Sequence, residues 1–184
     1  MISRLFVSII FVAGMKITAA ICTYNRERYL PQVLGSLLTQ TLSSEEFEII
    51  VIDNNSPGNT KEIISNYTNK NSTYSITYFL ETKQGLSHAR NRSIVESNCD
   101  LITFIDDDAY LENNYLEILL EKFNSDSSIT AIGGKIILDY ETIKPKWENK
   151  YLNSLLGYYS PSKISFVYKN LSSNTDYPRG SNMS

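Results

Sequence analysis

Three consecutive carboxylates, Asp106, Asp107 and Asp108, follow the apolar run 101–105. Carboxylates this close repel one another, and a divalent cation with oxygen ligands would relieve the repulsion. Mg²⁺ and Mn²⁺ take one or two carboxylates plus substrate phosphates. Because side chains alternate along an extended chain, we expect Asp106 and Asp108 to point to one side and Asp107 to the other. A helix cap near Asn113 is the alternative, but a cap needs only one aspartate, so the triplet favours a metal site.

Polar side chains also follow the apolar runs 17–22 and 47–53. The first run leads into three of them: Thr23, Tyr24 and Asn25. The second run ends at Asp53, whose carboxylate can accept the N–H of a nucleobase or the hydroxyls of a ribose. The alternative is that Asp53 is an ordinary turn residue before Pro57 and Gly58.

The segment 85–91, GLSHARN, carries groups that can bind an anion. Its glycine permits a tight turn into a helix whose first N–H groups can face an anion. Arg90 offers a planar fork for a phosphate or a base carbonyl. The alternative is an exposed helix arginine, and we assign His88 to packing or to the surface.

The segments that must position these residues alternate between strand-like and helix-like patterns. Short apolar runs predict strands at 17–22, 47–53, 74–80, 101–105 and 129–138. Apolar residues at helical spacing predict helices at 26–39 (the helix proper beginning near Pro31), 60–67, 86–97 and 114–123. The strands recur about every 30 residues, the length of a βαβ unit, and their nearly continuous apolar character indicates burial on both faces. We therefore predict an α/β, doubly wound, mostly parallel sheet with helices on both faces, which binds ligands beyond the carboxyl ends of its strands.

The 184 residues suit one domain, which we place at 15–184. Residues 5–13 are apolar but far short of the ~20 that span a bilayer. We expect residues 1–14 to be an apolar extension or a membrane-contacting tail, and the apolar part of a signal peptide is the alternative. Residues 140–184 look like an irregular covering segment.

Composition excludes several functions. The net charge of −3, from 17 basic and 20 acidic residues, gives no basic field for nucleic acid. Two cysteines and one histidine are too few for a structural zinc site, which needs about four ligands. No G-x-S-x-G motif supports a Ser-His-Asp triad. Two lone cysteines fit a reducing compartment, so we expect a cytoplasmic protein, with peripheral contact at the inner face of the membrane as a further expectation.

Four motifs in order resemble the family 2 glycosyltransferases, which have the Rossmann-like GT-A fold: CTYNR (22–26), VIDNNS (51–56), GLSHARN (85–91) and FIDDDA (104–109). Two later pieces, Ile132-Gly133-Gly134 and residues 180–184, are also similar to the family pattern, so the resemblance covers residues 16–184. It implies transfer of a sugar from a nucleotide-diphosphate donor, a UDP-sugar, to a glycan or other hydroxyl acceptor. It further implies an inverting, metal-assisted displacement and a place in polysaccharide or other glycan assembly.

The resemblance also implies roles by position. The donor would be bound by Thr23, Tyr24, Asn25, Asp53, Arg90, Asp106 and Asp107. Asp53 would hold the base, usually uracil. Asp108 and Asp106 would hold the Mn²⁺ or Mg²⁺ ion that bridges the diphosphate.

One departure concerns the general base. The family usually places it in a Glu-Asp-like segment downstream of the G-x-N-M piece, whereas this sequence ends at Ser184. The last acids upstream do not match that motif: Asp139, Glu141, Glu148 and Asp176. We therefore assign no catalytic base and expect the acceptor-binding part to lie beyond Ser184.

Three other functions are weighed against this one. A nucleotide-sugar-binding fragment without catalysis agrees with the missing base. A nucleotidyltransferase would carry a Gly-rich, Lys- or Arg-bearing loop after the first strand, but CTYNRERY has no glycine. A phosphoacceptor receiver domain would need a lysine at a late strand end and would not place the acidic triplet on the fourth strand.

Overall fold

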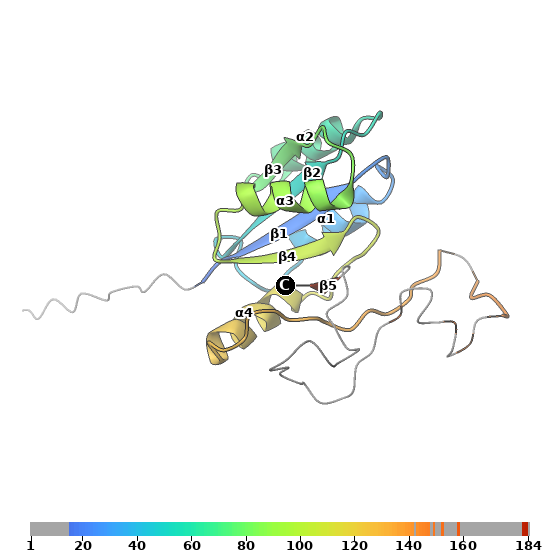
Figure 1. The fold of residues 1–184 in the computed structure, drawn as a ribbon. Helices are drawn as coiled ribbons and strands as arrows, with labels where there is room; N and C mark the ends of the chain where they lie inside the picture. The colour runs from blue at the N-terminus through green and yellow to red at the C-terminus, as the bar shows by residue number, and fades with distance from the viewer. Residues whose placement is uncertain are drawn as a thin grey trace, which may run out of the picture.

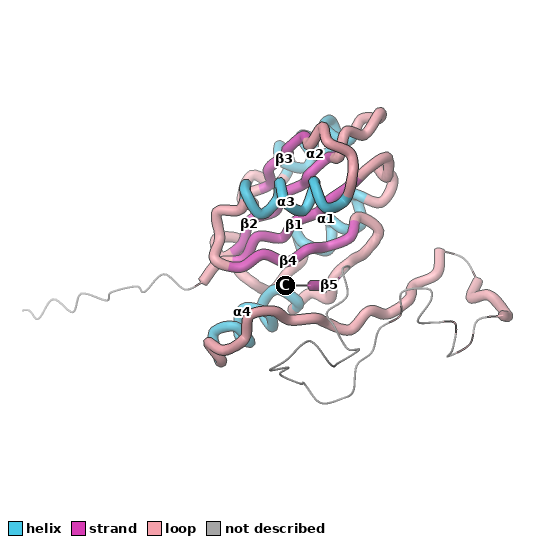
Figure 2. The backbone as a smooth tube through the Cα atoms, in the orientation of Figure 1, coloured by secondary structure: helices cyan, strands magenta, loops and turns pink. Residues whose placement is uncertain are grey.

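The computed structural model describes residues 15–141, 143–147, 149, 152, 158 and 182–183. The strands in this part of the chain are β1 (Ile17–Thr23), β2 (Phe47–Asp53), β3 (Ile76–Leu80), β4 (Leu101–Asp106) and β5 (Asn182–Met183). They form one sheet of order β3-β2-β1-β4-β5, with β1 to β4 parallel and β5 antiparallel to β4 (Figure 1). The helices that follow the four parallel strands are α1 (Leu30–Leu38), α2 (Thr60–Lys70), α3 (Leu86–Glu96) and α4 (Tyr115–Ser125) (Figure 2).

The two faces of the sheet carry separate apolar cores. On one face, Ile21 and Val51 belong to a cluster completed by side chains of α1, α2 and α4. On the other face, Ala20, Ile50 and Phe104 form a smaller cluster, and α3 lies across it (Figure 1). Successive residues of one strand, such as Ala20 and Ile21, therefore face opposite cores. The predicted doubly wound α/β sheet with helices on both faces is confirmed.

The helix after β1 begins at Leu30, beside Pro31, where the helix proper was predicted to start. Residues 26–29 form a turn in which the Tyr29 N–H bonds the Arg26 carbonyl at 3.1 Å. Pro31 then occupies the first turn of α1, where its missing N–H costs nothing. The buried residues Leu30, Val33, Leu34 and Leu37 lie at helical spacing and fix α1 against the sheet. Arg26 therefore lies in the turn between β1 and α1, near the carboxyl end of β1.

The predicted strand at 129–138 is wrong. Only isolated bridges occur there, at Gly133 and Ile136, and Ile137 is exposed. Paired glycines weaken a strand because they have no side chains to pack and lose more backbone freedom on ordering. The edge of β4 is instead paired with β5, with Phe104 opposite Met183 and Ile105 opposite Asn182.

Two predicted segments lie partly or wholly outside the described residues. Residues 1–14 are outside, and so is most of 140–184. Within the part of the chain that the structure describes, every helix is too short or too polar to span a bilayer.

Candidate functional site

The register of the sheet brings the predicted strand ends together. Thr23 pairs with Asp53 across β1 and β2, and Cys22 pairs with Asp106 across β1 and β4. The Asn54 N–H then bonds the Thr23 carbonyl at 2.8 Å, which continues the β1–β2 contact one residue further. Thr23, Asp53 and Asp106 therefore end neighbouring strands along one edge of the sheet, where doubly wound sheets bind ligands.

Both oxygens of Asp53 are held by donors. The side chain is buried, with the residue only 4% exposed. The Ser56 N–H donates to Oδ1 at 2.8 Å, and the Tyr78 hydroxyl donates to Oδ2 at 2.9 Å. Burial, followed by the hydrogen bond to Asp53, raises the pKa of Tyr78 to about 12. The Ser56 contact agrees with a turn role, but each carboxylate oxygen has two lone pairs, so Asp53 keeps capacity for a base N–H.

Asn54 connects the end of β2 to α3, a role that the sequence motifs do not reveal. Its amide nitrogen donates to the Glu81 and Lys83 carbonyls at 3.1 and 2.6 Å. Its amide oxygen accepts the Gly85 N–H at 2.8 Å. Gly85 has a φ of 129°, a conformation that favours glycine, and α3 begins at the next residue. Asn54 thereby fixes the start of the helix that carries Arg90.

The loop after β1 places Tyr24 and Asn25 beside the same edge. Asn25 adopts a left-handed φ of 54°, which asparagine tolerates, and its N–H donates to the Ser56 hydroxyl at 3.0 Å. This contact joins the loops after β1 and β2. Tyr24 is half-exposed, so its ring is accessible to a ligand at the edge.

The acidic triplet spans the end of a strand and a turn. β4 ends at Asp106, and the Ala109 N–H bonds the Asp106 carbonyl at 3.0 Å. Asp107 is only 6% exposed, and its Oδ2 accepts a 2.7 Å hydrogen bond from the Thr23 hydroxyl. Thr23 itself is buried, so its side chain reaches the triplet rather than open solvent.

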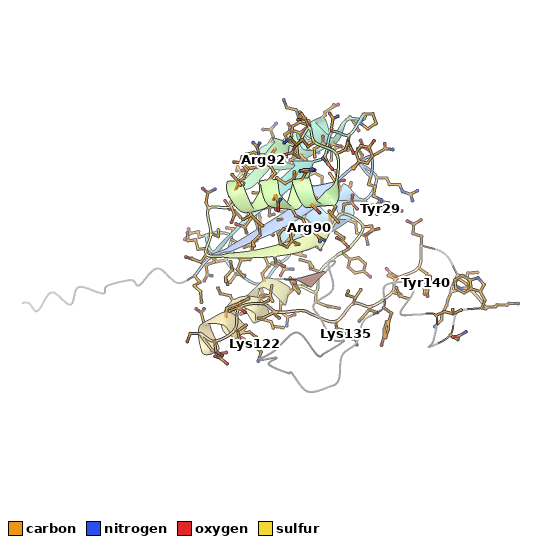
Figure 3. All side chains as sticks on the ribbon, viewed as in Figure 1. Tyr29, Arg90, Arg92, Lys122, Lys135 and Tyr140 are labelled. Carbon is orange, nitrogen blue, oxygen red and sulfur yellow. The ribbon has the colours of Figure 1, made fainter. Side chains whose placement is uncertain are left out.

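Two arginines pair with the triplet. Arg26 Nη1 lies 3.2 Å from Asp107 Oδ1 and also hydrogen-bonds Asp108 Oδ2. Arg90 Nη2 lies 3.6 Å from Asp106 Oδ1, and its guanidinium stands 5.4 Å over the Phe104 ring. In Figure 3 the labelled Arg90 lies where α3 passes in front of the sheet beside β4.

These contacts correct two expectations about the triplet. Asp107 and Asp108 share one partner, Arg26, so they do not point to opposite sides; the strand ends at Asp106 and the turn redirects the side chains after it. Three carboxylates also face two guanidiniums, which leaves one net negative charge (−3 + 2). Repulsion within the triplet is therefore already reduced and does not by itself require a cation.

The end of β4 is partly buried, which changes the acidity of its groups. Burial raises the pKa of Asp106, while Arg90 opposes that change. Burial also raises the pKa of the neighbouring Cys22 to about 12, again against the effect of Arg90. Charges at this edge therefore interact more strongly than they would in open water.

The triplet can contribute two ligands to a hard cation. Asp106 and Asp108 have side chains that are 39% and 44% exposed, whereas Asp107 is enclosed. Among the described residues, no three His, Cys, Asp or Glu side chains converge on one metal position. Two carboxylates nevertheless suit Mg²⁺ or Mn²⁺ when substrate phosphates and water complete the shell. The residues present fit such an ion, and in the ion-free chain Arg26 pairs with Asp108.

The acids considered for a general base are occupied elsewhere or lie outside the described residues. Asp139 accepts a 2.8 Å hydrogen bond from the Tyr110 hydroxyl. Glu141 lies 3.7 Å from Arg28 on the surface. Glu148 and Asp176 are outside the described part of the chain.

Curated proteins similar to this chain are glycosyltransferases. Glycosyltransferase GlyA of Streptococcus pneumoniae is 32% identical over 118 residues, which cover 64% of this chain and 16% of GlyA. Poly(ribitol-phosphate) beta-N-acetylglucosaminyltransferase TarS of Staphylococcus aureus is 27% identical over 157 residues, which cover 82% of this chain and 27% of TarS. The chain thus spans less than half the length of these relatives.

Solved structures share the fold. TarS 1–349 in complex with UDP superposes with a TM-score of 0.62 at 24% identity, covering 72% of this chain and 38% of that one. Mannosyltransferase PcManGT of Pyrobaculum calidifontis, in complex with GDP-Man and Mn²⁺, gives a TM-score of 0.60 at 20% identity, covering 66% of this chain and 36% of that one. The family model described as "Glycosyl transferase family 2" matches residues 18–179, nearly the whole chain. The chain therefore belongs to glycosyl transferase family 2.

Proposed function

We propose that this chain forms the donor-binding part of a glycosyltransferase, which moves a sugar from a nucleotide-diphosphate donor to a hydroxyl of a glycan or other acceptor. The observation that carries the proposal is that Asp53 ends β2 and the acidic triplet 106–108 ends β4, on the two sides of β1, with Arg90 of α3 3.6 Å from Asp106. Carboxylates can bind base and ribose, while a guanidinium can bind the diphosphate. Membership of the family supports the same assignment.

We propose that the donor base lies at Asp53 and that the base is uracil. Asp53 would accept the base N–H, and the accessible ring of Tyr24, with Asn25 beside it, would contact the nucleoside. TarS, which is 27% identical over 157 residues, has structures with UDP and UDP-GlcNAc. Guanine also offers an N–H to a carboxylate, and the mannosyltransferase binds GDP-Man, so the test below compares both nucleotides.

We propose that Asp108, with Asp106, holds Mn²⁺ or Mg²⁺. When bound, this ion supplies positive charge to the departing diphosphate. Arg90 would contribute a second positive group on the α3 side, and Thr23 would keep Asp107 in place through its hydrogen bond. A single displacement would invert the anomeric carbon, with a carboxylate base taking the proton of the acceptor hydroxyl. The identity of that base is left unassigned.

The proposal includes a cellular location and a class of acceptor. Cys22 and Cys99 are both free thiols, which fits a reducing, cytoplasmic location. Peripheral contact with the inner face of a membrane through residues 1–14 is proposed on their apolar sequence alone. A hydroxyl of a polymer as acceptor fits the relatives, because TarS is named for poly(ribitol-phosphate).

Calorimetry on the 184-residue chain tests the donor site. We expect UDP to bind in the presence of Mn²⁺, and to lose affinity after chelation and in Asp108→Asn. Asp126→Asn serves as the control, because Asp126 is an exposed carboxylate after α4 that bonds Ser128. Equal UDP binding after chelation would remove the metal from the proposal, tighter binding of GDP would reassign the base, and no binding of either nucleotide would refute the donor site.

A further inference from the structure

Arg26 occupies the position that the proposed metal needs. Its guanidinium bridges Asp107 and Asp108, and these two hydrogen bonds raise the already high pKa of Arg26. None of the donor-binding roles implied by the family pattern uses this residue. Its guanidinium nevertheless forms an ion pair with Asp108.

The two carboxylates under Arg26 differ in how firmly they are held. Asp107 is buried and keeps a 2.7 Å hydrogen bond from Thr23, so it stays in place without the arginine. Asp108 is half-exposed, and Arg26 is the partner that the structure gives it. At Asp108, a divalent cation would therefore compete with Arg26, the partner of this carboxylate among the described residues.

Arg26 is free to move away once it is displaced. Its side chain is 47% exposed and sits in the turn between β1 and α1, outside any helix. Its other contact is a loose stacking 5.4 Å from the centre of the Tyr29 ring, at the edge of the molecule (Figure 3). Exposed ion pairs are weak, and a guanidinium binds phosphate oxygens as well as carboxylates.

We propose that Arg26 is an internal cation that holds Asp108 in the nucleotide-free chain, gives it up to the divalent ion, and then binds the donor diphosphate. This inference rests on the proposed function, because it assumes a metal at Asp108. A guanidinium beside a dication is repelled, and the arriving diphosphate offers it new oxygen partners.

The exchange predicts a thermodynamic coupling between metal and nucleotide. Without nucleotide, the metal must displace Arg26 and binds weakly. With nucleotide, Arg26 has an alternative partner and the metal binds more tightly. Because coupling is reciprocal, the metal strengthens UDP binding by the same factor.

Titration of Mn²⁺ followed by electron paramagnetic resonance tests this without any activity assay. We compare the parent with Arg26→Gln, and use Arg28→Gln as the matched control, because Arg28 contacts Tyr29 and Glu141 but not the triplet. Arg26→Gln should tighten nucleotide-free Mn²⁺ binding about three- to tenfold, the range for a part-exposed charged pair. It should weaken UDP binding at saturating Mn²⁺ about tenfold. Arg28→Gln should change neither.

A thermal melt shows whether each variant is folded, and Arg26→Lys provides a second variant that keeps the positive charge. Lysine keeps the charge but cannot bridge two carboxylates with a fork, so we expect an intermediate Mn²⁺ affinity. Unchanged or weaker nucleotide-free Mn²⁺ binding in a folded Arg26→Gln chain overturns the competition while leaving the proposed function intact. Unchanged UDP binding overturns the transfer of Arg26 to the diphosphate. Absence of Mn²⁺ binding in the parent, with and without UDP, overturns both the inference and the metal part of the proposed function.

Discussion

The hydroxyl of Thr23 donates a 2.7 Å hydrogen bond to Oδ2 of Asp107 and so ties the end of β1 to the turn after β4. Both residues are buried, and the second oxygen of Asp107 is taken by Arg26. A buried carboxylate is costly unless donors surround it. Asp107 therefore acts as the fixed point of the acidic triplet, while Asp106 and Asp108 remain accessible.

We expect Thr23→Val to destabilise the chain by about 1–3 kcal/mol, because the substitution keeps the shape but removes a donor from a buried charge. Urea unfolding measures the free-energy difference. Thr23→Ser is the control, since it keeps the hydroxyl and should lose less. Equal stability of the valine variant and the parent would mean that Asp107 finds another donor.

We expect Asp53→Asn to weaken UDP binding by about 1.5–3 kcal/mol, or roughly 10–150-fold, because a charge-assisted hydrogen bond to the base is lost. Calorimetry with Mn²⁺ present measures the affinity. Tyr78→Phe is the companion variant: it removes the 2.9 Å contact to Oδ2 but leaves the carboxylate in place, so it should lose less affinity. If Asp53→Asn binds UDP as tightly as the parent, Asp53 serves only the turn that bonds Ser56.

The strands and helices that position the site could be predicted from sequence because their signals are local. The runs 17–22, 47–53 and 101–105 are mostly apolar, and the structure extends the first and third by one residue each. The run 129–138 looked the same but is not a strand. Its sequence carried no information on which segment pairs with the edge of β4, and Asn182–Met183 does so instead.

The sequence predicts which site residues lie at strand ends, but not which side chains they contact. The motifs place Asp53 and the triplet at one edge, which the register confirms. Tyr78 lies inside β3 with no motif around it, and its contact with Asp53 depends on the sheet register. Arg26 follows Asn25 in a recognised motif, but its reach to Asp108 depends on the turn at residues 26–29 before α1.

We expect Cys22 to resist alkylation in the folded chain. Burial raises the pKa of its thiol from 9.0 to about 12, and the thiolate is the reactive form. At pH 8 the folded thiolate fraction is therefore roughly 10³-fold below that of the unfolded chain. Iodoacetamide labelling followed by peptide mass spectrometry measures the rate, with the chain in concentrated urea as the control. Similar rates in both states would show that the end of β1 is solvated.

We expect the Asp106 carboxylate to lower the free energy of unfolding of the chain at neutral pH. Burial raises the pKa of Asp106, against the opposing effect of Arg90, and Asp108 and Asp107 raise it further. The folded chain thus holds this proton more tightly than the unfolded chain. The free energy of unfolding must therefore fall as the pH rises from the unfolded pKa of about 3.9 through the higher folded value.

Asp106→Asn should remove this penalty. The variant should be more stable than the parent at pH 7, and the difference should shrink as the pH falls below about 4. Urea unfolding across this pH range measures both effects, and Asp100→Asn, an exposed aspartate just before β4, is the matched control. The same variant should bind UDP with Mn²⁺ more weakly, since stability is commonly exchanged for function at such sites. A variant no more stable than the parent at pH 7 would show that Arg90 compensates fully for the burial of Asp106.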